Sequence, residues 1–419
     1  MPSRVPLSLL FLLLFTISFQ DISWGATPSD EDPSESLLSL PYIQYVETEK
    51  APDKQGTTIY NKNKAFSGYN IYTSNNNLDV FVKLIDMDGA LVHAWDRNPQ
   101  DKSSRWQHVL PFPNGSIFLT SQWTQLDWQL LDANSRNLAV YDIPGQKAHH
   151  AAYWLNETGF LSLLQNTIRI PFQDLSLKIE DNSLVHVSSQ GVALKTVSLG
   201  KLLAADPNYQ EKCKKIYDKL KKSPPTPSKR KPKEPSFEIL HANNIENLEW
   251  DIPGIAKKGS WLITIRNLSK IILVDPNKEE ILWQWGENTI SRPHHATFLK
   301  GDKILLFDNG VQQKSSRVIV IDIKSKEILW QYGQKPGQEF FTATGGSAQR
   351  LPNGNTLITQ SEEGRAFEVT DSGAIVWEWY ADFYLSGKHK GKRRTIYRMQ
   401  RLPYNFFTNV TFNHGKTKP

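Results

Sequence analysis

Short apolar runs separated by polar turns recur along most of the chain. In each copy an apolar strand leads into a turn rich in Asp, Asn, Gly or Ser, and a second apolar strand follows, often ending in Trp. Apolar runs on both sides of such a turn predict a β-hairpin. The clearest copies cover residues 83–95, 129–145, 184–200, 271–286, 318–333 and 366–380.

A second hairpin pattern lies between these copies. It is clearest in the segments HVLPFPNGSIFLTSQ, HATFLKGDKILLFDNG and AQRLPNGNTLITQSEEG. Together the two patterns give four short strands for each repeat, which is the content of one propeller blade. Six copies fit blades of about 40–45 residues with insertions. The sequence therefore predicts an all-β fold, a six-bladed β-propeller, because a sandwich would not explain the regular return of one hairpin.

The repeat also sets the expected domain boundaries. We expect the propeller to occupy residues 46–400, after an acidic, Ser- and Pro-rich segment at 26–45 that is typical of flexible chain. An insertion at 201–235 interrupts the rhythm, first with a predicted surface helix and then with a basic, Pro-rich linker. Residues 401–419 are expected to form a C-terminal tail. The segment after Tyr380 either closes the ring or wraps around it.

The first residues have the features of an export signal. Arg4 supplies a positive start, and the apolar run Leu9–Phe19 is too short to span a bilayer. Small residues up to Gly25 suit cleavage after that residue. We therefore expect a cleaved signal peptide at 1–25 and a secreted or periplasmic protein with no membrane span in its mature form. A single N-terminal anchor is the alternative.

The sequence bears on two kinds of covalent modification, disulfides and glycans. The chain has one cysteine, Cys213, so an internal disulfide is impossible. Four glycosylation sequons begin at Asn114, Asn156, Asn267 and Asn409, and they would make the protein a glycoprotein in a eukaryotic host.

The net charge of +6 is concentrated in two basic stretches, Lys212–Lys233 and Lys388–Arg394. Neither stretch has the interleaved aromatic residues that stack on bases. Together with export, this predicts solvated loops rather than a nucleic-acid-binding surface.

Histidines recur at one position of the repeat. Counted back from the Gly of the second hairpin, His108 and His294 both lie seven residues upstream, and Ser347 occupies the same position in a third repeat. His149 with His150 and, in another repeat, His241 lie near that position. Blades are related by rotation about one axis, so one repeat position approaches the axis from every blade. We expect His149, His241 and His294 to converge at one end of the central channel.

Two polar residues accompany this histidine position. Asn243 follows His241 by two residues and shares its strand face, and Arg266 follows an apolar strand in the same repeat. Three interpretations remain open for the group. The histidines are structural, or they hold Zn or Cu, or they form an oxyanion site in which one imidazole is the nucleophile. The metal interpretation is weakened by the arginine and by the lack of an accompanying carboxylate, so we expect no metal.

The chain resembles the aryl sulfate sulfotransferases that do not use a nucleotide sulfate donor. The most specific segments are HANNIENLEWD with ITIRN, then SRPHHATFLKGDKILLFDNG, and then SAQRLPNGNTLITQSEEGRAFEVTDSGAIVWEW. The resemblance extends over most of the chain. It implies an exported six-bladed propeller that moves a sulfuryl group from a phenolic sulfate to a phenol acceptor through a sulfohistidine, with no cofactor.

The resemblance also implies roles for particular residues. His294 matches the nucleophile, with His295 as the alternative if the register differs by one. The sulfate-binding residues correspond to His241, Asn243 and Arg266. His149 or His150 corresponds to a further sulfate-contacting or acid–base histidine.

Two features separate this chain from the bacterial enzymes. We expect it to lack their separate N-terminal β domain, and it carries the basic insertion, so the resemblance does not fix its oligomeric state or phenol specificity. A non-catalytic secreted propeller that binds or scaffolds a partner is the main alternative. A quinone-dependent dehydrogenase would need more blades and calcium-binding carboxylates.

Overall fold

The computed structural model describes residues 45–46, 54–74, 80–97, 105–122, 128–222, 235–384, 390–410 and 412. The expected signal peptide, nearly all of the acidic segment and most of the basic linker lie outside the described residues. Among the residues that are described, no helix combines the length and apolarity needed to cross a membrane.

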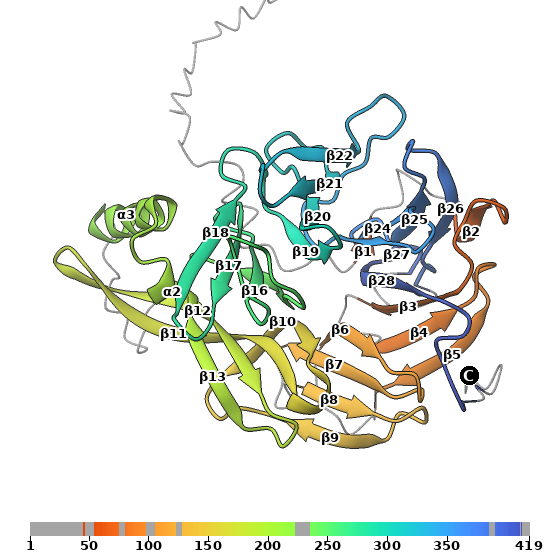
Figure 1. The fold of residues 1–419 in the computed structure, drawn as a ribbon, viewed down its shortest axis with the longest axis horizontal. Coiled ribbons are helices and arrows are strands. Elements are labelled where there is room, and N and C mark those ends of the chain that lie inside the picture. The colour runs from red at the N-terminus through yellow and green to blue at the C-terminus, as the bar shows by residue number, and fades with distance from the viewer. Residues whose placement is uncertain are drawn as a thin grey trace, which may run out of the picture. The chain divides into compact units, whose positions relative to one another are not determined.

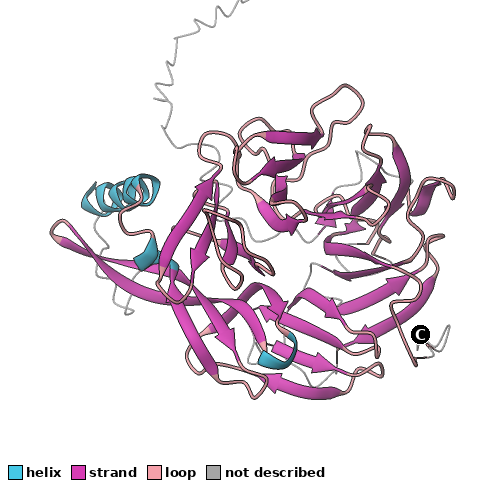
Figure 2. Ribbon diagram, in the orientation of Figure 1, coloured by secondary structure: helices cyan, strands magenta, loops and turns pink. Residues whose placement is uncertain are grey.

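Six sheets form the blades of a propeller, which we number I to VI along the chain. Strands that neighbour one another in a blade run antiparallel, and the first strand of each blade contacts the first strand of the next blade around a central channel. Figure 1 shows the blades following one another in order of colour, and Figure 2 shows how strongly strands predominate over helices. The predicted six-bladed β-propeller is confirmed.

The strands of each blade are given from the channel outwards. Blade I contains β28 (Ile396–Leu402), β3 (Tyr69–Ser74), β4 (Phe81–Ile85) and β5 (Leu91–Asp96). Blade II contains β6 (Arg105–Pro111), β7 (Ile117–Gln122), β8 (Trp128–Leu131) and β9 (Asn137–Tyr141). Blade III contains β10 (Lys147–Trp154), β11 (Phe160–Phe172), β12 (Leu175–Val187) and β13 (Ala193–Ser198).

The second half continues in the same order. Blade IV contains β15 (Ala242–Asn247), β16 (Trp261–Ile265), β17 (Lys270–Asp275) and β18 (Glu280–Trp285). Blade V contains β19 (His294–Leu299), β20 (Lys303–Asp308), β21 (Arg317–Asp322) and β22 (Ile328–Tyr332). Blade VI contains β23 (Ser347–Arg350), β24 (Thr356–Gln360), β25 (Arg365–Val369) and β26 (Ile375–Tyr380), with β2 (Gly56–Tyr60) added outside β26.

Shorter elements complete the described structure. Strand β14 (Phe237–Glu238) pairs with β12, and β1 (Tyr45–Val46) pairs with β27 (Arg393–Arg394). A short 3-10 helix, η3, covers Asn156–Thr158.

The two ends of the chain close the ring in blade I. Strand β28 comes from the C-terminal end, yet it pairs with β3, the first strand of the repeat region, as Figure 1 shows in blue beside orange. The closure carries an ion pair of 3.0 Å between Arg401 of blade I and Glu368 of blade VI, both fully buried. The segment after Tyr380 therefore closes the ring, and β28 extends two residues into the expected tail.

The hydrophobic core lies between the blades rather than inside one of them. The buried apolar residues of the described chain form six clusters, and each cluster joins two successive blades. Trp95, Trp128 and Trp377 are fully buried in three of them. Burying a large apolar side chain contributes roughly 1.5–3 kcal/mol, so these tryptophans hold neighbouring blades together.

The predicted helix of the insertion is present as α3 (Pro207–Lys222), after the short helix α2 (Leu199–Leu202). Asp206 caps it, because its Oδ1 accepts hydrogen bonds from the backbone N–H groups of Asn208 and Tyr209. The helix packs its apolar face, including the buried Cys213, against the hairpin β11–β12.

Candidate functional site

The channel strands are irregular where the predicted site residues lie. Register shifts interrupt the first strands of five blades, at 106–109, 149–152, 242–244, 294–297 and 396–399. Three histidines at or beside these bulges, His150, His241 and His295, have φ values of 58°, 51° and 50°. Such left-handed backbone is costly for residues other than glycine and tends to occur at functional sites.

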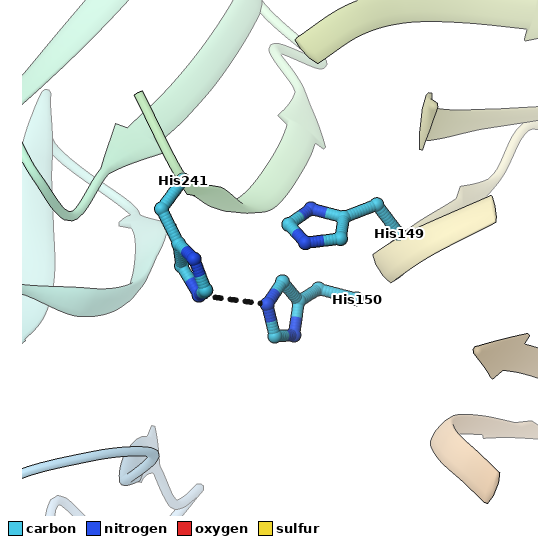
Figure 3. A group of neighbouring side chains, drawn as sticks. All are labelled: His149, His150 and His241. Carbon is cyan, nitrogen blue, oxygen red and sulfur yellow. Dashed lines mark hydrogen bonds between the residues drawn. The ribbon is translucent and has the colours of Figure 1, made fainter. Parts of the chain in front are cut away.

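His149, His150 and His241 meet at one end of the channel, and we call them the histidine cluster. Figure 3 shows the three imidazoles facing one another from β10 and from the residue before β15. The Nε2 atoms of His150 and His241 are 3.0 Å apart, and one ring nitrogen from each of the three residues lies within 4.8 Å of the others. Burial lowers the pKa of His149 to about 3. Burial, together with the neighbouring histidines and Arg398, holds the pKa of His150 well below its usual range.

The Nδ1 atoms of the histidine cluster are each fixed by a neighbour. His149 Nδ1 lies 3.0 Å from the Ala242 carbonyl oxygen, and His150 Nδ1 lies 3.1 Å from the Tyr397 hydroxyl. His241 Nδ1 lies 2.8 Å from a carboxylate oxygen of Glu238, the ion-pair partner that the sequence did not indicate.

Glu238 brings a negative charge to this end of the channel. Burial alone would raise the pKa of its carboxyl, but His241, His149 and Arg266 lower it to about 2. The expectation that no carboxylate accompanies the histidines is therefore wrong. The sequence did not indicate Glu238, because this residue lies on a separate short strand before its partner His241.

His294 begins β19 and is held in one tautomer. Its Nδ1 lies 2.7 Å from Asn309 Oδ1, and the Asn309 amide nitrogen donates to the carbonyl oxygens of Thr342 and Gly345 at 2.9 Å each. The Asn309 oxygen is thus the acceptor, so Nδ1 of His294 carries the hydrogen. Nε2 then bears the lone pair, and this atom is buried without a hydrogen-bond partner among the described residues. Burial, and then the Arg266 guanidinium, hold the pKa of His294 well below its usual range.

Two buried arginines lie beside this imidazole. Nη1 of Arg266 and Nη1 of Arg292 both donate to Asn267 Oδ1 at 3.1 Å. Two guanidiniums held at one oxygen create a positive region that favours an anion. The Asn267 amide nitrogen donates to the Glu238 carbonyl oxygen and the side chain is buried. The folded protein therefore does not offer the sequon at Asn267 for glycosylation.

Asn243 is fully buried but presents an acceptor rather than a donor. Its Nδ2 donates to the carbonyl oxygen of Pro293 at 2.9 Å, and its Oδ1 has no partner within the described chain. A carbonyl oxygen requires a donor, so the amide cannot be reversed without losing that bond. Its unpartnered atom suits a hydroxyl hydrogen better than a sulfate oxygen.

His295 does not join its neighbour His294. It lines a cavity of about 350 Å³ further along the channel, together with His108, Arg398 and Glu246. Its Nδ1 accepts a hydrogen bond from the Ala348 N–H group of the next blade, and His108 Nδ1 accepts one from Ala152 in the same way. Consecutive histidines at the bulge thus face different parts of the channel.

The alignment of His108 with His294 is wrong. In blade II, the Phe112 N–H group donates to the Ser116 carbonyl oxygen, so Gly115 is the third residue of a three-residue turn. In blade V, Gly301 is the middle residue of the turn between the paired Leu299 and Lys303. Counting back from the glycine therefore reaches different depths of the channel. His108 lies inside the bulge of β6 and has no register partner on β7, whereas His294 pairs with Phe307 at the edge of the bulge of β19.

The structure thus brings together four of the predicted site residues, with Arg266 and Asn243 beside them, whereas His295 lies apart in the cavity. The histidine cluster and His294 interact electrostatically, and Arg266 acts on His294 and on Glu238. Asn243 contacts the residue before His294. Arg292, Asn309, Glu238 and Tyr397 were missed, and only Arg292, which adjoins the Pro-His-His segment, had a sequence signal.

The fold and the site define a β-propeller with buried imidazoles and guanidiniums gathered at one end of its channel. Residues 179–383, just under half of the chain, match the model of the arylsulfotransferase (ASST) family, so this part of the chain is similar to that family. The predicted resemblance is confirmed, and the match supports a sulfotransferase-type enzyme. The matched range contains His241, Asn243, Arg266, His294 and His295.

Solved structures with a similar fold have little sequence in common with this chain. A protein of unknown function from Bacteroides caccae is 14% identical, with a TM-score of 0.48 and coverage of 80% of this chain and 98% of that chain. A catalytically inactive virginiamycin B lyase from Staphylococcus aureus, solved with quinupristin, is 12% identical, with a TM-score of 0.38 and coverage of 69% and 73%.

A third similar structure is the β-propeller domain of Cps50 (Swd1) from Myceliophteria thermophila. It is 10% identical, with a TM-score of 0.42 and coverage of 78% of this chain and 87% of that chain. Similarity at this level says nothing about function. No curated protein matches the chain.

Proposed function

We propose that this protein is a secreted or periplasmic aryl sulfate sulfotransferase that needs no nucleotide donor. It moves a sulfuryl group from a phenolic sulfate to a phenol through a covalent intermediate on His294. The proposal rests mainly on one atom, the buried Nε2 of His294, which has no hydrogen-bond partner among the described residues. A neutral imidazole with a free lone pair is the nucleophile that this chemistry requires.

The environment of His294 keeps this lone pair available. Asn309 accepts the Nδ1 hydrogen at 2.7 Å, so the tautomer is set before substrate binds. Burial and Arg266 hold the pKa of His294 well below its usual range, so the imidazole is neutral at pH 7.

The reaction proceeds in two balanced steps. In the first, Nε2 attacks sulfur, the N–S bond forms, and the S–O bond to the aryl group breaks while the leaving oxygen gains a proton. In the second, the acceptor phenol loses its proton, its oxygen attacks sulfur, and the N–S bond breaks to restore the Nε2 lone pair. As in phosphoryl transfer, the negative charge resides on the three equatorial oxygens of the moving group.

We expect Arg266 and Arg292 to stabilise those oxygens, and the meeting of both guanidiniums at Asn267 beside His294 supports this role. His241 is proposed to contact the same oxygens. Asn243, whose unpartnered atom is an oxygen, is proposed to accept the hydroxyl hydrogen of the incoming phenol.

We assign the proton transfer to the hydrogen-bonded pair His150–His241 rather than to His150 alone. Burial and neighbouring charges hold the pKa of His150 well below its usual range, so it does not store a proton by itself. The Glu238 carboxylate lies 2.8 Å from His241 and supplies the negative charge that an imidazolium needs. His149 lies beside the pair, with its ring centroid 4.1 Å from that of His150, and is proposed to contact the substrate. The reaction itself uses no metal or organic cofactor.

The test uses purified full-length protein, 4-nitrophenyl sulfate as donor and a panel of phenols as acceptors. Nitrophenolate release should depend on the acceptor, with ping-pong kinetics. His294→Ala should lower the rate by about 10⁴-fold or more, since it removes the covalent route. His295→Ala, which changes the adjacent imidazole in the separate cavity, should retain most of the rate.

Trapping the intermediate completes the test. After a pulse of donor without acceptor, a peptide containing His294 should gain the mass of one sulfuryl group. No nitrophenolate release with any phenol, or a His294→Ala variant as fast as the wild type, would refute the proposal. A sulfuryl group found on His295 instead would assign the nucleophile to the other histidine.

A further inference from the structure

The histidine cluster has the arrangement of a three-histidine metal site. Its three imidazoles come from two neighbouring blades, and Figure 3 shows their ring edges directed at a shared space. The Nε2 atoms of His150 and His241 are 3.0 Å apart, and the cluster offers three ring nitrogens within 4.8 Å of one another. Imidazole nitrogens that bind one Zn²⁺ ion at about 2.0–2.1 Å are separated by distances of this order.

The Nδ1 atoms of the three histidines also have the surroundings of a metal site. Histidines that bind metals nearly always donate the hydrogen of the other ring nitrogen to a carboxylate, a carbonyl or a similar acceptor. Each Nδ1 of the cluster meets such a group, at 2.8–3.1 Å: a carboxylate (Glu238), a backbone carbonyl (Ala242) and a hydroxyl (Tyr397). When all three Nδ1 atoms carry their hydrogens, all three Nε2 lone pairs face inward.

The close contact between His150 and His241 fits this interpretation. Two Nε2 atoms at 3.0 Å need one hydrogen between them, otherwise two lone pairs would face each other. A metal ion would replace that single hydrogen and bind both lone pairs. The backbone holds the rings in place, since both residues have φ values between 50° and 60°, which is costly for residues with a side chain.

We propose that His149, His150 and His241 bind one divalent transition-metal ion, Zn²⁺ or Cu²⁺, through their Nε2 atoms. Imidazole suits both ions, and three protein ligands leave a further position for water or an anion. The Glu238 carboxylate offsets one of the positive charges that Arg266 and the ion bring to this end of the channel. No fourth histidine is needed, and His294 stays outside the set.

Metal binding and sulfuryl transfer would exclude each other at these residues. The proposed reaction uses hydrogens on the histidine cluster, whereas a metal ion occupies the lone pairs that those hydrogens would cover. If the proposed function is also correct, Zn²⁺ inhibits transfer by competing with the donor. The binding of the ion itself does not depend on that function.

The experiment titrates metal-stripped, untagged full-length protein with Zn²⁺ by calorimetry and with Co²⁺ by visible absorption. We expect one equivalent to bind, with a Co²⁺ spectrum of nitrogen ligation. His150→Ala should lower the affinity at least about 100-fold, and Glu238→Gln, which keeps all three ligands, should lower it about 10–100-fold. His108→Ala removes a half-buried channel imidazole outside the cluster and should bind normally.

Each of the following results supports or overturns the proposed metal site. No stoichiometric binding to folded wild-type protein, as judged by circular dichroism, would overturn the proposal, and so would equal affinities in the wild type and His150→Ala. A Glu238→Gln effect matched by His108→Ala would show that the loss is structural and would also overturn it. Stoichiometric binding by a protein that releases no nitrophenolate would uphold the metal site and count against the sulfotransferase.

Discussion

Replacing Asn309 with alanine removes the acceptor that orients His294. We expect this variant to lose transfer rate to a degree that its loss of stability does not explain. The Asn309 side chain is fully buried and makes three hydrogen bonds: one accepted from His294 Nδ1, and two donated to the carbonyl oxygens of Thr342 and Gly345. In Asn309→Ala all three of these hydrogen bonds are lost. His294 Nδ1 keeps only a longer contact of 3.3 Å with the Arg292 carbonyl oxygen.

The size of the effect follows from these contacts. His294 Nδ1 and the Thr342 carbonyl oxygen keep longer contacts of 3.3 and 3.4 Å with other groups. A buried polar group that loses its partner costs about 1–3 kcal/mol, so the free energy of unfolding should fall by an amount in that range. Loss of the tautomer lock should reduce the transfer rate by about 10–100-fold, which corresponds to about 1.4–2.7 kcal/mol in the barrier.

The control is Ser316→Ala. Ser316 Oγ donates to the Asn309 carbonyl oxygen at 2.8 Å and accepts from the Thr342 N–H group at 3.1 Å, so it supports the same loop without contacting His294. Urea unfolding should show both variants destabilised. Nitrophenolate release, measured where both are folded, should stay within about threefold of the wild type for Ser316→Ala.

Nitrogen NMR of the imidazoles reports the tautomer of His294, which a loss of stability alone does not change. The wild type should show His294 with hydrogen on Nδ1, and Asn309→Ala should show a mixture of tautomers. The reasoning fails if Asn309→Ala transfers sulfuryl groups at the wild-type rate, or if Ser316→Ala slows the reaction as much as Asn309→Ala does.

Three further predictions concern stability. Burial raises the pKa of Glu246 from its ordinary 4.5 to about 8, so between these values the folded protein binds a proton that the unfolded chain has released. The free energy of unfolding should therefore fall as the pH rises, by at most about 1.4 kcal/mol per pH unit, and urea unfolding at pH 5 and pH 8 should show a flatter dependence for Glu246→Gln. Glu368→Gln leaves the fully buried Arg401 without its counter-charge and should cost about 3–5 kcal/mol, whereas a charge-free exchange of both residues should cost much less in the same assay. Ending the chain before β28 removes the channel strand of blade I, and size-exclusion chromatography should find aggregated or expanded protein rather than a stable monomer.

The fold could be predicted because its signal is local. Each hairpin carries its own apolar strands and turn, and the Trp at the end of a hairpin is buried against the next blade, as with Trp95. Closure of the ring could not be predicted in the same way. Strand β28 follows the last repeat, and its pairing with β3 joins residues more than 300 positions apart.

The site could be predicted only in part, because its partners come from different blades. The histidines stood out by their rarity and by their place in the repeat. The residues that control them, Glu238, Asn309 and Tyr397, have no such pattern, since each is defined by a contact across a turn or between blades. Alignment by glycine failed for His108 because the glycine takes a different place in the turn from blade to blade and because bulges shift the strand register.

The bulges explain how one channel holds two different environments. In a regular strand, neighbouring side chains alternate strictly between the two faces of a blade. At the bulge of β19 the extra residue lets His294 turn to Asn309 in its own blade, while His295 turns to Ala348 of the next blade. The left-handed backbone at His295 has a conformational cost of about 1 kcal/mol or more. This backbone conformation is what directs the two rings to different partners. The same device at His150 and His241 directs two imidazoles at each other. The chemistry at this end of the channel therefore depends on backbone irregularities, which a substitution that restored regular pairing would remove.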